Sequence, residues 1–137
     1  MKNKTYKIGF CCGVFDLGHL GHINFLKEAQ SKCDILTIGI VTDKAVKEKK
    51  GNDRPILNLQ ERYNWLIAMD YNQCNIYNQD TFNPSLNISC IQPDIFIKGE
   101  DQFHIPEVIA KELRIPVVYL NRTEGISTSD IIKRIRK

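Results

Sequence analysis

Strand-like runs rich in β-branched and aromatic residues alternate with helical patterns along the whole chain, and short connections separate them. The expected strands cover residues 6–12, 35–41, 74–77, 94–98 and 116–120. The expected helices cover residues 21–30, 58–69, 84–90, 106–113 and 127–136. Strands that are joined through helices pair in parallel with right-handed crossovers. We therefore expect an α/β protein with a three-layer, Rossmann-like, doubly wound sheet of about five parallel strands.

The helix expected over residues 58–69 carries the clearest local signals. Asn58 is a good N-cap, and Glu61 follows three residues later, as in a capping box. The strand over residues 35–41 is apolar on both faces, which suits a buried strand of a parallel sheet.

Composition is that of a soluble globular protein, with 42% hydrophobic and 26% charged residues. The length of 137 residues fits one domain, expected to span residues 1–137. No apolar run approaches the roughly 18 residues that cross a bilayer, so no membrane association is expected. The basic start, residues 1–7, leads into the first strand and does not resemble a signal peptide, which predicts a cytoplasmic protein.

Charge and cysteine content exclude some functions. The formal net charge of +3 is too small to indicate nucleic-acid binding, and no nucleic-acid partner is expected. The five cysteines form no C-x-x-C pair, so neither a zinc site nor a thioredoxin-like motif is supported. Buried, reduced thiols are expected instead.

Two histidines lie three residues apart where the first helix begins. His19 and His22 follow the first strand, with Gly21 between them. A helix N-terminus offers unpaired N–H donors and a positive dipole end to anions. Gly21 has no Cβ, so a bulky ligand can approach the backbone there. A phosphate-binding pair is favoured over a metal pair, which lacks a visible third ligand, and over incidental loop histidines.

A basic cluster follows the second strand and contains Lys44, Lys47, Lys49, Lys50 and Arg54. We interpret it as a mobile loop whose lysines can follow phosphate charge as it shifts toward a leaving group. A solvated charged face is the alternative.

Arg62, in the following helix, points either toward the same cleft or into solvent as an ordinary helix arginine. Taken alone, the sequence favours the ordinary exposed arginine.

Hydroxyl residues open the last helix. Ser127, Thr128 and Ser129 place hydroxyls and backbone N–H groups at a second helix N-terminus, and Arg122 supplies a planar fork of phosphate donors. Simple helix capping explains part of this pattern. At the end of the fourth strand, the stretch from Lys98 to Asp101 is either a turn or a place for a base or ribose.

These residues resemble the cytidylyltransferase branch of the HxGH nucleotidylyltransferase superfamily, typified by glycerol-3-phosphate cytidylyltransferase. The likeness rests on G-V-F-D-x-x-H-x-G-H after the first strand and on R-T-E-G-I-S-T-S before the last helix. It covers residues 8–135. The resemblance implies a single nucleotidylyltransferase domain and a homodimer.

The resemblance implies a role for each motif residue. His19 and His22 would bind the triphosphate and stabilise the transition state, with Lys49 (or Lys47 or Lys50) and Arg122 as further catalytic groups. Arg62 would contact substrate phosphate. The nucleotide-binding set would contain Gly13, Phe15, Asp16, Gly21, Lys98, Gly99, Asp101, Thr123, Ser127 and Thr128.

The reaction so implied transfers CMP from CTP to a small phosphorylated alcohol or sugar and releases pyrophosphate. Mg²⁺ would be held mainly by the nucleotide's phosphates and water, with no metal-ligand residues expected from the protein. Gln102-Phe103-His104 follows Asp101 where the glycerol-3-phosphate enzymes often carry an aromatic residue, so the acceptor stays open.

Two alternatives remain. Heptose-phosphate adenylyltransferases share the Arg54-Pro55 and Lys98-Gly99-x-Asp101 neighbourhoods, which allows ATP with a heptose phosphate or an FMN-like acceptor. A nucleotide-binding module without catalysis is the third interpretation, and the complete set of transition-state groups disfavours it.

Overall fold

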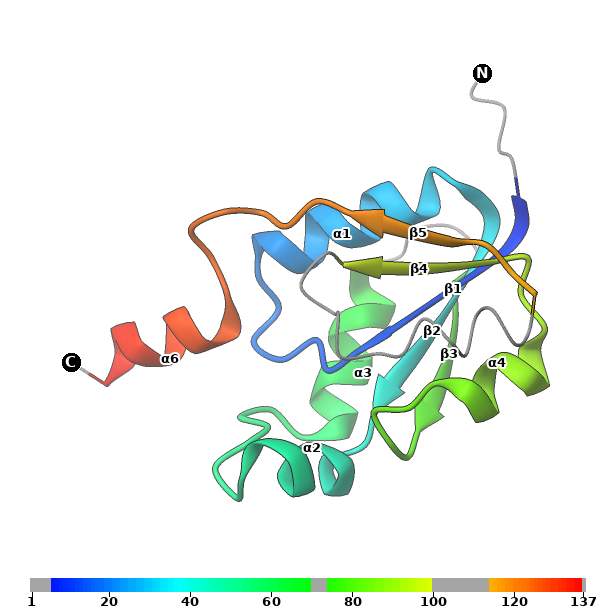
Figure 1. Cartoon of the computed structure of the whole chain (residues 1–137). Helices are drawn as coiled ribbons and strands as arrows, with labels where there is room; N and C mark the ends of the chain where they lie inside the picture. The colour runs from blue at the N-terminus through cyan, green and yellow to red at the C-terminus, as the bar shows by residue number, and fades with distance from the viewer. Residues whose placement is uncertain (1–5, 70–73, 100–113, 137) are drawn as a thin grey trace.

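The computed structural model describes residues 6–69, 74–99 and 114–136 (Figure 1). The strands are β1 (Tyr6–Gly13), β2 (Cys33–Val41), β3 (Cys74–Gln79), β4 (Ile95–Gly99) and β5 (Val117–Leu120). The helices are α1 (Leu20–Gln30), α2 (Asp43–Lys50), α3 (Leu59–Met69), α4 (Ser85–Ile91) and α6 (Thr128–Ile135). Each agrees with an expected element to within a few residues, except α2. The helix expected over residues 106–113 lies outside the described residues.

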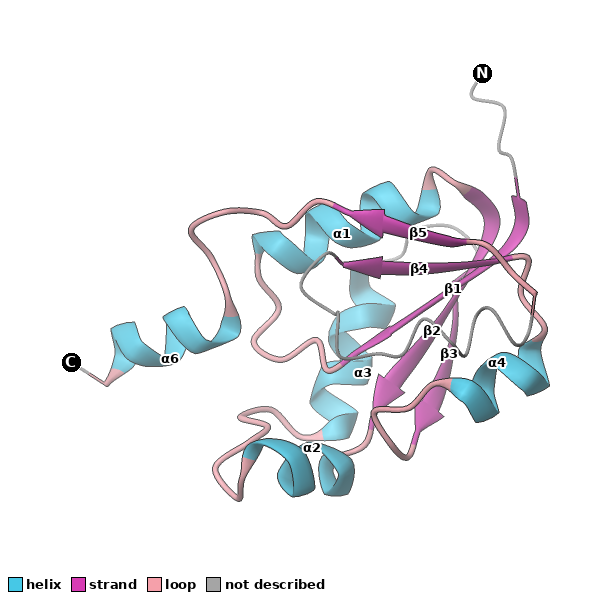
Figure 2. Ribbon diagram, in the orientation of Figure 1, coloured by secondary structure: helices cyan, strands magenta, loops and turns pink. Residues whose placement is uncertain are grey.

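The five strands form one parallel sheet in the order β3-β2-β1-β4-β5 (Figure 2). From β1 the chain first adds β2 and β3 on one side. It then crosses back and adds β4 and β5 on the other side of β1. In such a doubly wound sheet the crevice for a ligand lies beyond the carboxyl ends of the strands, where the order reverses. The predicted Rossmann-like α/β fold is confirmed.

Helices cover both faces of the sheet and bury two apolar clusters. On one face, Leu26 of α1 and Leu66 of α3 pack with Cys11 of β1. On the other face, Ile88 of α4 packs with Phe10 of β1. Because successive residues of β1 point to opposite faces, one strand contributes to both clusters. No helix among the described residues has the length and apolar character needed to cross a membrane.

The α3 helix begins as the sequence predicts. Asn58 Oδ1 accepts a hydrogen bond from the Glu61 N–H at 2.9 Å, and Glu61 Oε1 accepts one from the Asn58 N–H at 3.0 Å. This reciprocal pair satisfies N–H groups that would otherwise lack helical partners.

Helix α2 corrects the expectation of a mobile basic loop after the second strand. Residues 43–50 contain neither Gly nor Pro, and Lys, Glu and Ala are good helix formers. Ala45 and Val46 are buried, which anchors the helix to the protein. The helix ends at Gly51, whose φ of 98° suits glycine.

Helix α6 differs from the other helices because it buries none of its residues. Figure 1 shows it beyond the carboxyl edge of the sheet, away from the layers that α1, α3 and α4 form. Its first turn is nevertheless placed beside the end of β1, as described below.

Gly18 should tolerate no side chain, because a Cβ at this position would overlap the indole ring of Trp65. We expect Gly18→Ala to lower the free energy of unfolding by about 1–3 kcal/mol, measured by urea denaturation. In a Trp65→Leu background the same substitution should cost much less. Equal losses in both backgrounds would show that Trp65 is not the obstacle.

Candidate active site

A pocket of about 390 Å³ opens at the carboxyl edge of the sheet. Residues from the early histidine motif and from the segment that opens α6 line it together. The sequence-predicted residues found in its wall are Gly13, Phe15, Asp16, His19, Gly21, His22, Lys49, Gly99, Arg122, Thr123, Ser127 and Thr128. The fold therefore brings together two motifs that lie about a hundred residues apart in the chain.

Two side-chain hydrogen bonds join the two motifs directly. Thr128 Oγ1 donates to the backbone oxygen of Asp16 at 2.9 Å. Asn24 Nδ2 of α1 donates to Thr123 Oγ1 at 3.0 Å. Ser127 is the N-cap of α6, and its Oγ accepts the Asp130 N–H at 3.1 Å. The expected capping role is thus combined with a place in the pocket wall.

The turn after β1 has an unusual backbone. Phe15 and Leu17 have φ values of 55° and 56°, in the left-handed region that residues with a Cβ rarely adopt. Such conformations cost roughly 1–3 kcal/mol each and persist where surrounding contacts fix them. Phe15 is buried in the core, and its ring contacts His22 edge-on with centroids 5.5 Å apart.

Asp16 fixes this turn from inside the protein. Its side chain is 1% exposed, and its carboxylate accepts the N–H groups of Ile56 at 2.7 Å and Leu57 at 2.9 Å. Arg54 Nε lies 3.9 Å from Asp16 Oδ2. The carboxylate therefore holds the segment before α3 against the histidine turn.

The two histidines form a stacked pair at the start of α1. Their ring centroids are 3.7 Å apart with an interplanar angle of 21°. His19 Nδ1 accepts the Gly21 N–H at 3.1 Å, and His22 Nδ1 accepts the His19 N–H at 3.3 Å. Because each Nδ1 is an acceptor, this network assigns the proton of each neutral ring to Nε2. The pair thus has two Nε2–H donors for an anion.

Burial keeps both rings neutral at pH 7. It lowers the pKa of His19, and it lowers the pKa of His22 to about 3, with the charges of His19 and Lys50 adding to the effect. Neutral donors can strengthen their hydrogen bonds as negative charge develops on a ligand.

Gly21 lines the pocket, and its lack of a side chain also affects the His19 ring. A Cβ at Gly21 would lie 2.9 Å from His19 Cε1, which is closer than two carbon atoms approach. The missing side chain therefore makes room for the His19 ring over the helix start. That ring position is what allows His19 Nδ1 to reach the Gly21 N–H.

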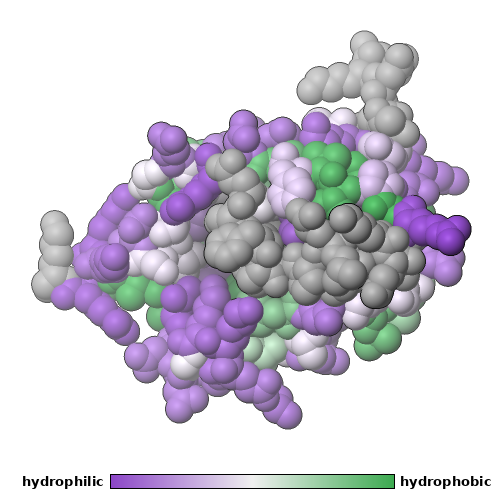
Figure 3. Space-filling model, viewed as in Figure 1, coloured by the Kyte–Doolittle hydropathy of each residue, from purple (hydrophilic) through white to green (hydrophobic). Residues whose placement is uncertain are grey.

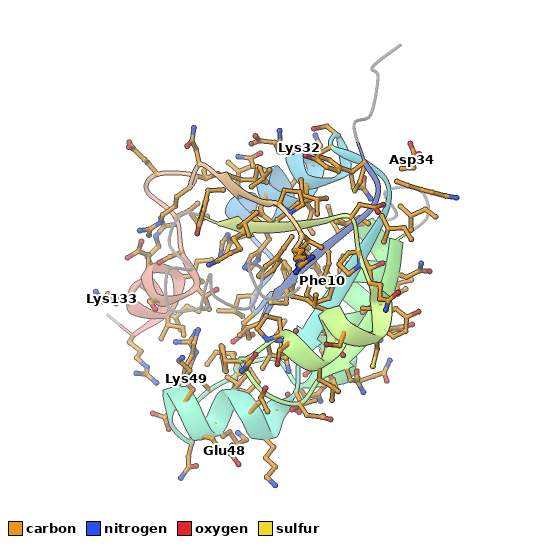
Figure 4. The ribbon with its side chains drawn as sticks, turned by 45° about the vertical axis from the view of Figure 1, so that its right-hand side comes forward. Phe10, Lys32, Asp34, Glu48, Lys49 and Lys133 are labelled. Atoms are coloured by element: carbon orange, nitrogen blue, oxygen red, sulfur yellow. The ribbon has the colours of Figure 1, made fainter. Side chains whose placement is uncertain are left out.

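The opposite wall of the pocket is basic. Lys49 and Lys50 of α2 line it together with Arg54, and hydrophilic residues gather over α2 in Figure 3. In Figure 4, Lys49 lies on the side of α2 that faces the body of the protein, whereas Glu48 points away. Among the described lining residues Asp16 is the sole acid. The pocket is therefore suited to a polyanion.

Of the three candidate lysines, Lys49 and Lys50 line the pocket and Lys47 does not. Lys47 Nζ donates to the backbone oxygens of Asn52 at 3.3 Å and Arg54 at 3.4 Å. Lys47 therefore helps to close the loop that follows α2.

Arg62 does not lie in the pocket wall, in contrast to both interpretations of the sequence. It is completely buried, and its Nη1 donates to the backbone oxygens of Val14 at 2.9 Å and Val41 at 2.8 Å. Its Nη2 pairs with Asp43 Oδ1 at 2.7 Å, and its Nε donates to the Leu57 oxygen at 3.0 Å. Arg62 thus connects the ends of β1 and β2 with the starts of α2 and α3.

Lys98 is also buried and does not line the pocket, although its neighbour Gly99 does. The Lys98 ammonium lies 5.2 Å from the ring centroid of Tyr119. Asp101 lies outside the described residues. The Cys12 thiol lines the pocket, but burial raises its pKa to about 12, so it is not a thiolate at neutral pH.

Sequence reasoning assigned no site role to several lining residues. Arg54 belonged to the basic cluster, but the spacing of that cluster does not show which of its side chains face inward. Gln79 is the last residue of β3 and Phe82 follows this strand, and neither belongs to a sequence motif. Their position at or just after the carboxyl end of a strand is the signal that could have identified them.

Acid should destabilise the ligand-free protein through His22. The unfolded chain takes up a proton at this imidazole below about pH 6.5, whereas the folded chain does so near pH 3. The free energy of unfolding should therefore fall as the pH drops from 6.5 toward 3, by up to about 1.4 kcal/mol per pH unit. Urea denaturation at pH 7, 6 and 5 measures this slope. His22→Gln should flatten this slope. An unchanged slope would contradict the attribution of the acid sensitivity to His22.

Comparisons with known proteins agree with the geometry. A cytidylyltransferase-like family model matches residues 10–134. The bifunctional protein HldE of Helicobacter hepaticus is 38% identical over 135 residues, covering 98% of this chain and 27% of that protein. HldE of Helicobacter pylori strain J99 is 35% identical over 140 residues, covering 100% of this chain and 29% of that protein. The chain thus spans little more than a quarter of the length of these relatives.

Solved structures share the fold. The lipopolysaccharide core biosynthesis protein of Thermoplasma volcanium has a TM-score of 0.70 at 23% identity, covering 88% of this chain and 99% of that one. Pantoate-beta-alanine ligase of Francisella tularensis has a TM-score of 0.60 at 14% identity, covering 98% and 70%. With the family model spanning both motifs, the chain belongs to the cytidylyltransferase-like family, within the HxGH nucleotidylyltransferase superfamily.

Proposed function

We propose that the protein transfers a nucleotidyl group from a nucleoside triphosphate to a phosphorylated sugar and releases pyrophosphate. The observation that carries this proposal is the convergence of two helix N-termini and a basic wall on one pocket. The starts of α1 and α6 meet through Thr128 and Asp16, and Lys49 and Lys50 face them from α2. A reaction between two polyanions requires such a concentration of positive potential.

In this reaction an oxygen of the acceptor's phosphate attacks the α-phosphorus of the triphosphate. The new P–O bond forms as the bond between the α-phosphorus and the bridging oxygen breaks, and pyrophosphate leaves with that electron pair. A phosphate monoester is already anionic near neutral pH, so no general base is needed. The protein's task is to align the two reactants and to stabilise the spreading charge.

Each group in the pocket has a place in this scheme. The Nε2–H groups of His19 and His22 donate to oxygens of the triphosphate, most strongly in the transition state. The Ser127 hydroxyl, the backbone N–H groups at the start of α6 and the guanidinium of Arg122 hold the remaining phosphate oxygens, while the Thr128 hydroxyl keeps the start of α6 on Asp16.

Mg²⁺ would enter with the nucleotide and neutralise part of its charge. Both carboxylate oxygens of Asp16 already accept backbone N–H groups, and the described residues contain no cluster of three metal-binding side chains. This donor set fits an ion held mainly by phosphate oxygens and water.

Similarity to the bifunctional HldE proteins supports ATP and a heptose phosphate as the substrates, in preference to the CTP-dependent reaction. CTP stays the second candidate, because the chain has the Arg122-Thr123 start that is typical of the cytidylyltransferase branch, and Thr123 contributes to the pocket wall through its bond to Asn24.

Pyrophosphate release should identify the substrates. We expect the highest rate when ATP is combined with a heptose phosphate in the presence of Mg²⁺, in a screen of four nucleoside triphosphates against phosphorylated sugars and alcohols. A faster reaction with CTP and glycerol 3-phosphate would instead establish the second candidate. No release with any pair, in a protein that binds nucleotide, would disprove nucleotidyl transfer.

His19→Ala should lower kcat by about two orders of magnitude or more, because a donor aimed at developing charge acts mainly in the transition state. Nucleotide affinity, measured by calorimetry, should fall much less. Asn52→Ala, on the exposed loop after α2, provides a control with normal activity. Equal losses in affinity and turnover for His19→Ala would contradict a transition-state role.

A further inference from the structure

The turn between β3 and α4 presents an aromatic ring to the pocket and is held by its own hydrogen bonds. Gln79, whose side chain is buried, donates through Nε2 to the Thr81 oxygen at 2.9 Å. Thr81 Oγ1 donates to the Asn83 oxygen at 3.0 Å and accepts the Asn83 N–H at 3.1 Å. These bonds fix the residues on both sides of Phe82, which lines the pocket. The ring is therefore in place before any ligand arrives.

Phe82 also packs against α2, the helix that carries the basic wall. Its ring contacts the cluster formed by Val41, Ala45 and Val46. The Lys49 ammonium lies 4.9 Å from the ring centroid, over the ring. Val46 and Lys49 lie three residues apart and share a face of α2. One rigid unit thus offers a cation and an aromatic surface side by side.

We propose that Phe82 is a specificity-determining residue for the phosphorylated acceptor. Its ring packs against the carbon skeleton of the sugar while Lys49 binds the phosphate that is attached to it. This assignment rests on the proposed nucleotidyl transfer. In the absence of ligand the ring holds the ammonium through a cation–π contact, and the phosphate draws the ammonium away when the acceptor binds.

The spacing of the two groups favours an acceptor over a nucleobase. In a sugar phosphate a single oxygen separates the phosphorus from the sugar, so its charge and its C–H groups lie a few ångströms apart. The Lys49 nitrogen starts 4.9 Å from the Phe82 centroid, so a short movement of this side chain brings its ammonium to the phosphate of a sugar that packs on the ring. In a nucleotide, a ribose separates the base from the nearest phosphate.

The order of the strands along the sheet also favours an acceptor at Phe82. The hydroxyl-rich start of α6 and Arg122 follow β5, at one edge of the sheet, whereas Phe82 follows β3 at the other edge. The histidine turn follows the central β1 strand and lies between them. When the triphosphate binds at the starts of α1 and α6, the phosphate of the acceptor binds at the basic wall that carries Lys49.

Steady-state kinetics of Phe82→Leu test the inference. We expect KM for the acceptor to rise by about tenfold or more, with KM for the nucleotide changed less than about twofold. Phe82→Tyr should keep the KM of the wild type. Tyr77→Leu is the matched control, because Tyr77 is a half-exposed aromatic residue on β3 outside the pocket wall, and it should change neither value.

Each outcome decides a separate question. A rise in KM for the nucleotide alone would place the base on Phe82 and overturn the inference while leaving nucleotidyl transfer intact. If the wild type shows no turnover, the proposed function fails, and calorimetric titration with a heptose phosphate and with glycerol 3-phosphate still tests Phe82. Weaker binding of either compound by Phe82→Leu than by the wild type would support its role. Equal affinities, or no binding to the wild type, would refute it.

Discussion

The buried carboxylate of Asp16 is the interaction on which the pocket depends. Charged hydrogen bonds of this kind contribute about 1.5–3 kcal/mol each, and Asp16 forms two with backbone N–H groups before α3. Its own backbone oxygen accepts Thr128 Oγ1 from the other end of the chain. A single residue therefore holds three segments together: the histidine turn, the approach to α3 and the start of α6. The left-handed φ values of Phe15 and Leu17 on either side of it are sustained by these contacts.

Arg62 has a similar structural role in the interior of the protein, where it also connects several segments. A fully buried cation is costly unless its donors are satisfied, and the guanidinium uses three backbone oxygens and Asp43 for this purpose. Asp43 is the first residue of α2 and also accepts the Leu59 N–H at 3.2 Å. The position of α2 relative to the histidine turn is therefore set by side chains that do not line the pocket. Asp16 and Arg62 together fix a site whose surface groups come from five different segments.

Much of this arrangement follows from the sequence, because periodicity and caps are local properties. The alternation of strands and helices led to the parallel sheet, and Asn58 with Glu61 marked the start of α3. Helix α2 was not predicted, because a segment with so many charged residues resembles a solvated loop. Just two buried residues, Ala45 and Val46, distinguish it from such a loop. Arg62 was misplaced because its burial depends on three partners distant in sequence, Val14, Val41 and Asp43. The same reason hid Phe82, whose importance comes from α2 packing beside it.

Helix α6 has a consequence for ligand affinity, because it buries no residue and is anchored chiefly by its first turn. Segments with so little buried surface open locally at a small fraction of the global unfolding free energy, and amide hydrogen exchange detects such opening. The residues that cap this helix also line the pocket. Occupancy of the pocket and helical order in α6 are therefore thermodynamically linked, so that changes in the solvent-facing turns of α6 alter the dissociation constant of a ligand that they do not contact.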